Sequence, residues 1–129
     1  MKEKINLDEL RKGFSGKKFR ELLRYHMHRQ KPEKIALGIK GTINMLNSLE
    51  AKVGERIIDY FNALAYSQEF WERDCGEVFN EIISMAREEI KKQGGKTTDE
   101  GLFNIFNIIV LNFALTAYEQ KSFRKFIGI

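Results

Sequence analysis

Apolar residues recur every three or four positions along most of the chain, which is the spacing that places them on one face of an α-helix. Gly residues separate these periodic stretches, a single Pro occurs, and strand-like alternation of apolar and polar residues is rare. The pattern therefore predicts an all-α protein, a compact bundle of four to five helices. At 129 residues the chain suits one core, so 1–129 is expected to form a single helical domain.

The N-terminal part of the chain predicts two helices. Residues 1–14 are expected to form a short helix and a turn, because Gly residues interrupt the pattern there. Ser15 can then cap a second helix that continues to about Gln30. Pro32 suits the first turn of the helix after that, where its missing N–H would be unpaired in any case.

Residues 33–66 keep one apolar face through steps of three and four. This segment is either one long helix or two helices that break near Gly54. Gly38 and Gly41 lie inside it at a cost of about 1 kcal/mol each relative to Ala. We interpret them as positions where another helix packs closely. The face consists of Ile35, Ile39, Ile43, Leu46, Leu49, Val53, Ile57, Phe61 and Leu64.

The next helix is predicted over 68–93, with Ser67 as its cap and Gly94 at its end. Its inward face consists of Trp71, Cys75, Val78, Phe79, Ile82 and Ala86. The turn that follows contains Gly-Lys-Thr, the order found at the end of a phosphate-binding loop. In such a loop another Gly precedes the Gly-Lys pair, with four residues between them, and it follows a strand. This chain has Ile90 at that position, in a predicted helix. Thr97 and Glu100 instead predict a capping box.

The most apolar stretch, 102–118, predicts a helix that is apolar on nearly every side and therefore central in the bundle. It is shorter than the about 20 residues that span a bilayer, and its Asn residues would be costly in lipid, so no membrane span is expected. Asn104, Asn107 and Asn112 fall within about 140° on a helical wheel. Because such residues can specify partner number, we interpret them as a seam that meets another subunit, as in a homodimer.

Residues 119–129 form a basic and aromatic tail. Two interpretations stay open: the tail packs back on the bundle, or it is a short hook for a partner or an anionic surface.

Composition changes the picture mainly through charge. With 43% apolar and 31% charged residues, the chain is typical of neither disordered nor integral membrane proteins. One Cys excludes an internal disulfide framework, and the first ten residues lack the apolar core of a secretory signal, so a cytoplasmic protein is expected. The net charge is +4, but residues 1–34 carry eleven basic and five acidic residues. The basic excess is therefore N-terminal.

Much of this excess lies on the second predicted helix. On a wheel with Phe19 at zero, most of its cations fall between about 100° and 180°. With Phe14 and Tyr25 beside them, they are a candidate surface for an RNA or DNA backbone, since phosphate contacts require only positive charge in the right places. Glu21 interrupts this surface. We call it the basic stripe: Lys17, Arg20, Arg24, His28, Arg29 and Lys31.

The helix predicted over 68–93 carries a corresponding acidic stripe, formed by Asp74, Glu77, Glu81 and Glu88. The two stripes can pair within one chain or between two chains, which gives register more than affinity. An alternative function is therefore a protein–protein adaptor or structural homo-oligomer. An exposed acidic helix face is a commoner arrangement than a Mg²⁺ or Ca²⁺ site, so no metal is expected here.

No residue pattern indicates catalysis. His26 and His28 are two apart and point about 200° from each other, so one metal ion cannot take both rings. We interpret His26 as a histidine at the edge of the core, and Cys75 as a buried thiol. The sequence therefore predicts a non-enzymatic binding protein without cofactor or metal, which contacts nucleic acid or a protein partner.

Overall fold

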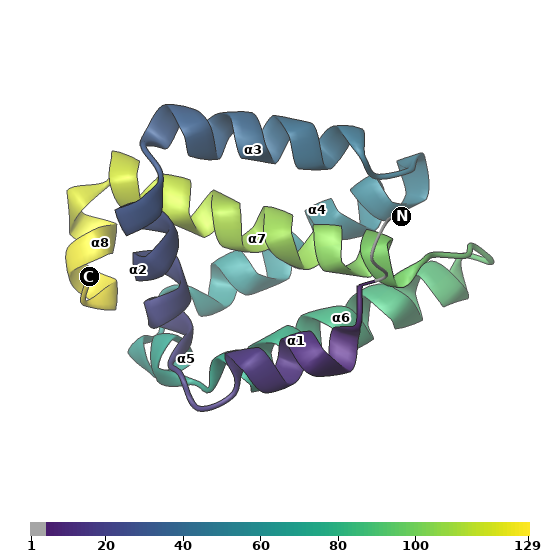
Figure 1. Ribbon diagram of the computed structural model, residues 1–129, viewed down its shortest axis with the longest axis horizontal. Coiled ribbons are helices and arrows are strands. Elements are labelled where there is room, and N and C mark those ends of the chain that lie inside the picture. Colours follow the sequence, from purple (N-terminus) through teal and green to yellow (C-terminus); the bar gives the residue numbers. More distant parts are fainter. Residues whose placement is uncertain (1–4) are drawn as a thin grey trace.

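A computed structural model describes residues 5–129, and every regular element in that range is a helix (Figure 1). The all-α prediction is confirmed, but eight helices in these residues replace the predicted four to five. The number differs because two predicted long helices are each broken and the C-terminal tail forms a helix of its own. The helices are α1 (Leu7–Phe14), α2 (Phe19–Arg29), α3 (Pro32–Asn44), α4 (Ser48–Leu64), α5 (Gln68–Glu72), α6 (Cys75–Lys92), α7 (Asp99–Glu119) and α8 (Lys121–Ile127).

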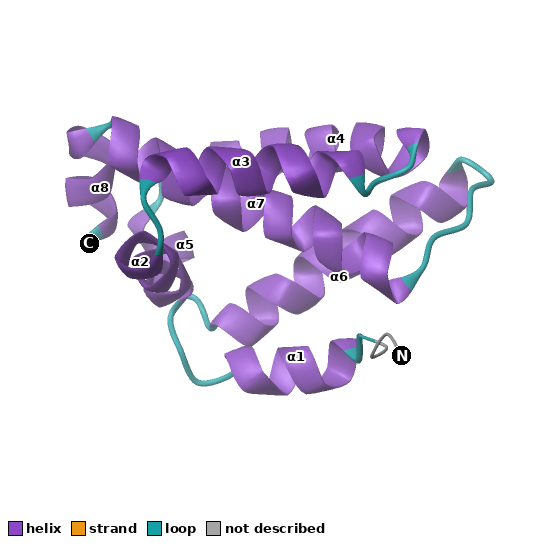
Figure 2. Ribbon diagram, turned by 45° about the horizontal axis from the view of Figure 1, so that its top comes forward, coloured by secondary structure: helices purple, strands orange, loops and turns teal. Residues whose placement is uncertain are grey.

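Helix α7 lies at the centre of the molecule, as its apolar pattern predicts. It packs against α2, α3, α4, α6 and α8, and most of its residues are buried. Figure 2 shows α3 and α4 on one side of α7 and α6 and α1 on the other. By length and composition alone α7 could cross a membrane, but 67% of its most apolar 18-residue stretch is buried inside the protein.

The segment 33–66 is two helices that break at 45–47, so both alternatives, one long helix and a break near Gly54, are wrong. Asn47 starts α4 through a capping box: its side chain accepts a hydrogen bond from the N–H of Glu50 at 2.8 Å, and the Glu50 carboxyl group accepts one from the N–H of Asn47 at 2.9 Å. Gly54 lies buried inside α4, beside Ile105 of α7. The cap, and not the glycine, sets the helix boundary.

The predicted helix over 68–93 is also broken into α5 and α6, because the backbone at Arg73 has an extended conformation. The extended residues lie antiparallel to those that precede α2. The N–H of Phe19 donates to the carbonyl of Arg73 at 2.8 Å, and the N–H of Cys75 donates to the carbonyl of Lys17 at 2.7 Å. Backbone partners from a distant segment thus replace the helical ones and hold the starts of α2 and α6 together.

Asp74 caps α6 at this junction. Its carboxylate accepts hydrogen bonds from the N–H of Glu77 at 3.1 Å and from the N–H of Gly16 at 2.6 Å. Ser15, the predicted cap of the second helix, instead ends α1, where its hydroxyl donates to the carbonyl of Arg11 at 2.9 Å. That prediction is wrong because α2 starts after the paired stretch, without a side-chain cap.

The turn between α6 and α7 departs from the predicted capping box. Helix α6 ends before Gly94, whose φ is 74°, as predicted. Helix α7, however, is capped by Thr98, whose hydroxyl accepts from the N–H of Gly101 at 3.1 Å. The hydroxyl of Thr97 instead donates to the buried carboxyl group of Glu50, so Thr97 links the start of α7 to α4.

Helix α3 packs mainly on α7, and only a narrow stripe of it is covered. Thr42 is buried, whereas Ile43, which the apolar pattern places on the inner face, is 46% exposed. A Cβ on Gly38 would lie 3.5 Å from Cδ1 of Leu111, which is an ordinary van der Waals contact, so α7 packs beside Gly38 but leaves room for an Ala there. Gly41 faces open space, so the same interpretation is wrong for that residue.

An aromatic cluster closes the end of the bundle where α2, α5, α7 and α8 meet (Figure 1). Its centre is Trp71, which is 1% exposed and whose indole N–H donates to the carbonyl of Ala65 at 2.9 Å. The tail 119–129 packs back on this cluster as α8, with Ile127 buried. The rings around Trp71 are those of Phe19, Phe70, Phe113 and Phe123.

Candidate functional site

A groove of about 810 Å³ lies between α1 and α2. Helix α2 runs at an angle to α1 and not alongside it, and the groove lies in the angle between the two helices (Figure 1). Helix α1 is held in place by its packing on α6. The apolar and aromatic residues of the lining are Leu10, Phe14, Leu22 and Tyr25, and Gly13 and the buried Cys75 also border the groove. Its charged residues and its histidine are Glu9, Lys17, Glu21, Arg24, His28 and Arg29.

Four of the six basic-stripe residues therefore come together in one groove. Lys17 contributes from the turn before α2, and the others from α2 itself. The remaining two lie elsewhere. Arg20 lines a smaller cavity against α8, and Lys31 stands in the extended link before α3.

The cations of the groove are accessible to a ligand. Arg24 lies 3.8 Å from the Glu21 carboxylate and donates to the carbonyl of Gly128 at 3.0 Å, and its side chain is 44% exposed. Exposed ion pairs of this kind contribute about 1 kcal/mol or less. Over residues 5–129 no ion pair engages Lys17 or Arg29. Their charge is therefore available to an anionic partner.

Tyr25 places an aromatic ring among these cations. It is 53% exposed, and the guanidinium carbon of Arg29 lies 5.1 Å from the centre of its ring. A cation–π contact of this kind at an exposed site contributes about 0.5–1 kcal/mol of attraction between the guanidinium and the ring. The groove thus offers positive charge and a solvent-facing aromatic surface side by side.

Residues of the acidic stripe have separate roles within the chain. Asp74 is the α6 cap described above, and Glu81 pairs with Arg73 at 2.7 Å. Glu77 and Glu88 are exposed. In the described part of the chain no ion pair joins the basic stripe to the acidic stripe. The two stripes do not neutralise each other within one chain.

The remaining titratable candidates are structural. His26 is half-buried at the core edge, as predicted, and burial lowers its pKa from the ordinary value. Cys75 is buried in the core, also as predicted; desolvation, and then the charge of Asp74, raise the pKa of its thiol to about 12. A thiol with that pKa is protonated at neutral pH and is no nucleophile. Within 5–129 no three His, Cys, Asp or Glu residues are grouped so that they could hold a metal ion.

The Asn seam is partly engaged by its own chain. Asn104 is 6% exposed, and the Asn112 amide donates to the carbonyl of Ile108 at 2.8 Å. Asn107 is half-buried. Contact of this seam with another subunit stays a prediction.

Fold and groove together define an all-α protein with a basic, aromatic-lined groove. Comparison of the chain with protein-family models, with curated proteins and with solved structures finds no match in any of the three.

Sequence reasoning found the cations of the groove and both of its aromatic residues, Phe14 and Tyr25. It missed Leu10 on α1 and Leu22 on α2 as lining, because the groove depends on where packing on α6 places α1 relative to α2. The signal in the sequence was the break between the first two helices, which lets α1 and α2 enclose a hollow.

Proposed function

We propose that this chain is a non-enzymatic binding protein whose α1–α2 groove holds the backbone of a single-stranded RNA or DNA. One observation carries the proposal: Lys17 and Arg29, which form no ion pair with any residue of 5–129, lie in the same groove as the exposed ring of Tyr25. Proteins that bind single strands combine positive charge along the backbone with aromatic rings on which bases stack.

The apolar floor supports a single strand more than a duplex. Leu10, Phe14 and Leu22 offer surface to bases, which only an unpaired strand can turn toward the protein. Glu9 and Glu21 also line the groove and repel phosphates. The nucleic-acid backbone is therefore expected to contact Lys17 and Arg29 and to avoid the two glutamates. Recognition of this kind depends strongly on salt and little on sequence.

Reversing the charges of Lys17 and Arg29 is expected to abolish most of this binding. For the doubly substituted Lys17→Glu/Arg29→Glu protein, affinity for a labelled single-stranded RNA should fall more than about tenfold at low salt. The slope of log affinity against log salt should lose about 1.4 units, since each phosphate contact on a single strand contributes about 0.7. Fluorescence anisotropy at several salt concentrations measures both quantities.

Lys34→Glu/Lys40→Glu is the matched control, because both residues are exposed cations on α3, outside the groove. This double variant changes the net charge by the same amount as Lys17→Glu/Arg29→Glu and should leave the salt slope unchanged. Equal binding by the Lys17→Glu/Arg29→Glu protein and the native protein, with both folded by circular dichroism, would remove the groove from the proposal.

A second function is favoured by the absence of stripe-to-stripe ion pairs among residues 5–129, which leaves exposed Glu77 and Glu88 available to another chain. In this alternative the chain self-associates, with the basic stripe of one copy against the acidic stripe of the next. Glu88→Lys should then weaken the dimer at least about tenfold, because it places like charges opposite each other. Sedimentation equilibrium measures the change, with Glu33→Lys on α3 as control; a dimer equally stable in both variants contradicts this arrangement.

A further inference from the structure

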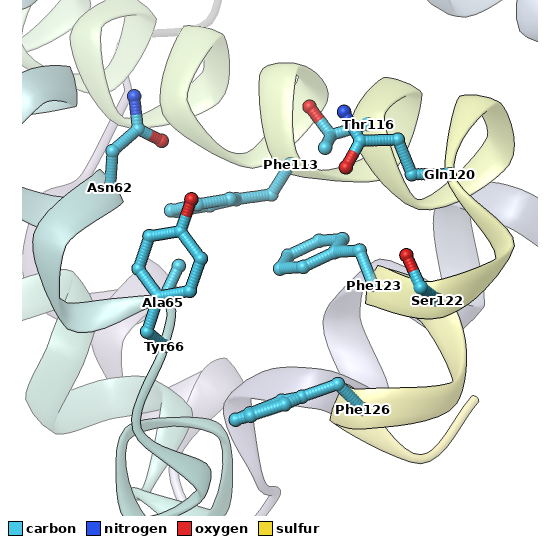
Figure 3. A pocket seen from close by; sticks show the side chains of 9 residues that line it. All are labelled: Asn62, Ala65, Tyr66, Phe113, Thr116, Gln120, Ser122, Phe123 and Phe126. Atoms are coloured by element: carbon cyan, nitrogen blue, oxygen red, sulfur yellow. The ribbon is translucent and has the colours of Figure 1, made fainter.

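A second pocket, of about 460 Å³, lies between the C-terminal ends of α4 and α7 and the start of α8. Figure 3 shows the rings of Tyr66, Phe123 and Phe126 around the same space, with Phe113 behind it. Tyr66 stands at the mouth and is 83% exposed, the largest exposure among the bulky apolar side chains in the described chain. The pocket is thus walled by aromatic rings, and one of them has nearly all its surface in water.

The polar groups of this pocket are uncharged. Asn62 and Gln120 bring side-chain amides to its rim, and Ser122 brings a hydroxyl group (Figure 3). Inside 5–129 none of these three groups makes a side-chain hydrogen bond to the protein. They are therefore available to a ligand that has both donors and acceptors on its edge.

We propose that this pocket holds one unstacked nucleobase. A base is planar, has a π-face for the aromatic rings, and carries an amide-like edge that Asn and Gln side chains can pair with. The absence of charge in the lining fits the base and not the phosphate. The volume is within the range of about 300–1,000 Å³ that small-molecule sites occupy.

The surroundings of the pocket provide for the phosphate. Phe126 also lines a neighbouring cavity of about 200 Å³ that contains the cations Arg20 and Lys125. Glu72 lines it as well and lies 3.7 Å from Arg20, whereas no ion pair engages Lys125 among residues 5–129. Gly128, which follows α8, lines this cavity too, and its carbonyl accepts a hydrogen bond from the guanidinium of Arg24. Arg24 is a residue of the α1–α2 groove. Cations therefore lie along the surface from the groove to the aromatic pocket. The base in the pocket belongs to the strand whose backbone the groove binds, so this inference rests on the proposed function.

The test uses a single-stranded oligonucleotide with one aminopurine, a fluorescent adenine analogue, in a run of thymines. Stacking in the pocket should quench the aminopurine, and Tyr66→Ala should restore its emission and weaken binding about 5- to 150-fold, the range for one lost base-stacking residue. The salt slope should not change, since no phosphate contact is lost. Because Tyr66 is exposed, its removal leaves the fold intact.

Tyr60→Ala is the matched control, because Tyr60 is an exposed tyrosine of α4, 47% exposed and outside the pocket, whereas Tyr66 follows the end of that helix. It should bind the strand as the native protein does. A Tyr66→Ala protein that binds and quenches like the native one overturns the pocket, while an unchanged salt slope leaves the groove proposal standing.

Free ligands distinguish a nucleobase from an aromatic protein side chain as the occupant of this pocket. Adenosine should shift the ring resonances of Tyr66 and Phe126 in NMR spectra of the full chain. If no strand binds at any salt, the proposed function fails; the adenosine shifts then still support a base pocket that takes free nucleosides, and their absence overturns it. Shifts with N-acetyltryptophanamide but none with adenosine would assign the pocket to an aromatic side chain of a protein partner and would overturn the nucleobase.

Discussion

Trp71→Ala is expected to lower the free energy of unfolding by about 3–5 kcal/mol, the usual range for truncating a buried aromatic residue. The indole is 1% exposed and stacks at 5.5 Å on Phe19, with edge contacts to Phe113 at 5.1 Å and Phe123 at 5.7 Å. Truncation leaves a cavity among rings that come from four helices, and these cannot all move inward together. The carbonyl of Ala65 also loses its donor.

Urea unfolding followed by far-ultraviolet circular dichroism measures this effect, since the variant lacks the single Trp of the chain. Trp71→Phe keeps most of the packing and should lose about 1–3 kcal/mol, the cost of a smaller ring and an unpaired carbonyl. If the urea concentration at the unfolding midpoint is the same for Trp71→Ala as for the native protein, the aromatic cluster is not a packed core.

Glu50→Ala is expected to have the second largest effect, about 2–4 kcal/mol, because hydrogen bonds to a carboxylate contribute about 1.5–3 kcal/mol each. Glu50 is 5% exposed and accepts from two donors, the N–H of Asn47 and the hydroxyl of Thr97. Its removal unpairs both donors and separates the start of α4 from the start of α7. Glu55→Ala, an exposed glutamate of the same helix, should change stability by less than about 0.5 kcal/mol.

A double-mutant cycle identifies the mechanism. Thr97→Ala should cost less in a Glu50→Ala background than in the native protein, because the two side chains share one hydrogen bond. Strict additivity of the two losses would mean that this contact contributes nothing. Gly101→Ala provides an independent check, since a Cβ there would overlap the Glu50 carboxyl group and should destabilise the same junction by about 1–3 kcal/mol.

The sequence was sufficient where one helix alone carries the information. The central position of α7 follows from apolar residues on all its sides, and the buried face of α6 follows from its spacing. It was insufficient where residues far apart decide a boundary. The break before α6 depends on backbone hydrogen bonds to Lys17 and Phe19, and the side-chain contact of Thr97 depends on Glu50 in another helix.

The same distinction applies to the candidate sites. The basic stripe was readable because its residues share one helical face. Its division into four groove residues and two others was not, since Arg20 is drawn toward α8 and Glu72, 3.7 Å away. The pocket at Tyr66 joins three segments that no local pattern connects, and only the folded chain brings them together.

The position of α7 has a consequence for the synthesis of this protein. Helices α2, α3, α4 and α6 all bury apolar side chains against α7, yet α7 begins only at Asp99 and is translated after them. Chains emerge from the ribosome at about 5–20 residues per second, so these four apolar faces are uncovered for several seconds. A nascent chain of this kind cannot complete its core stepwise. It is expected to depend on chaperones until α7 has emerged, and premature termination before Asp99 would release an aggregation-prone fragment.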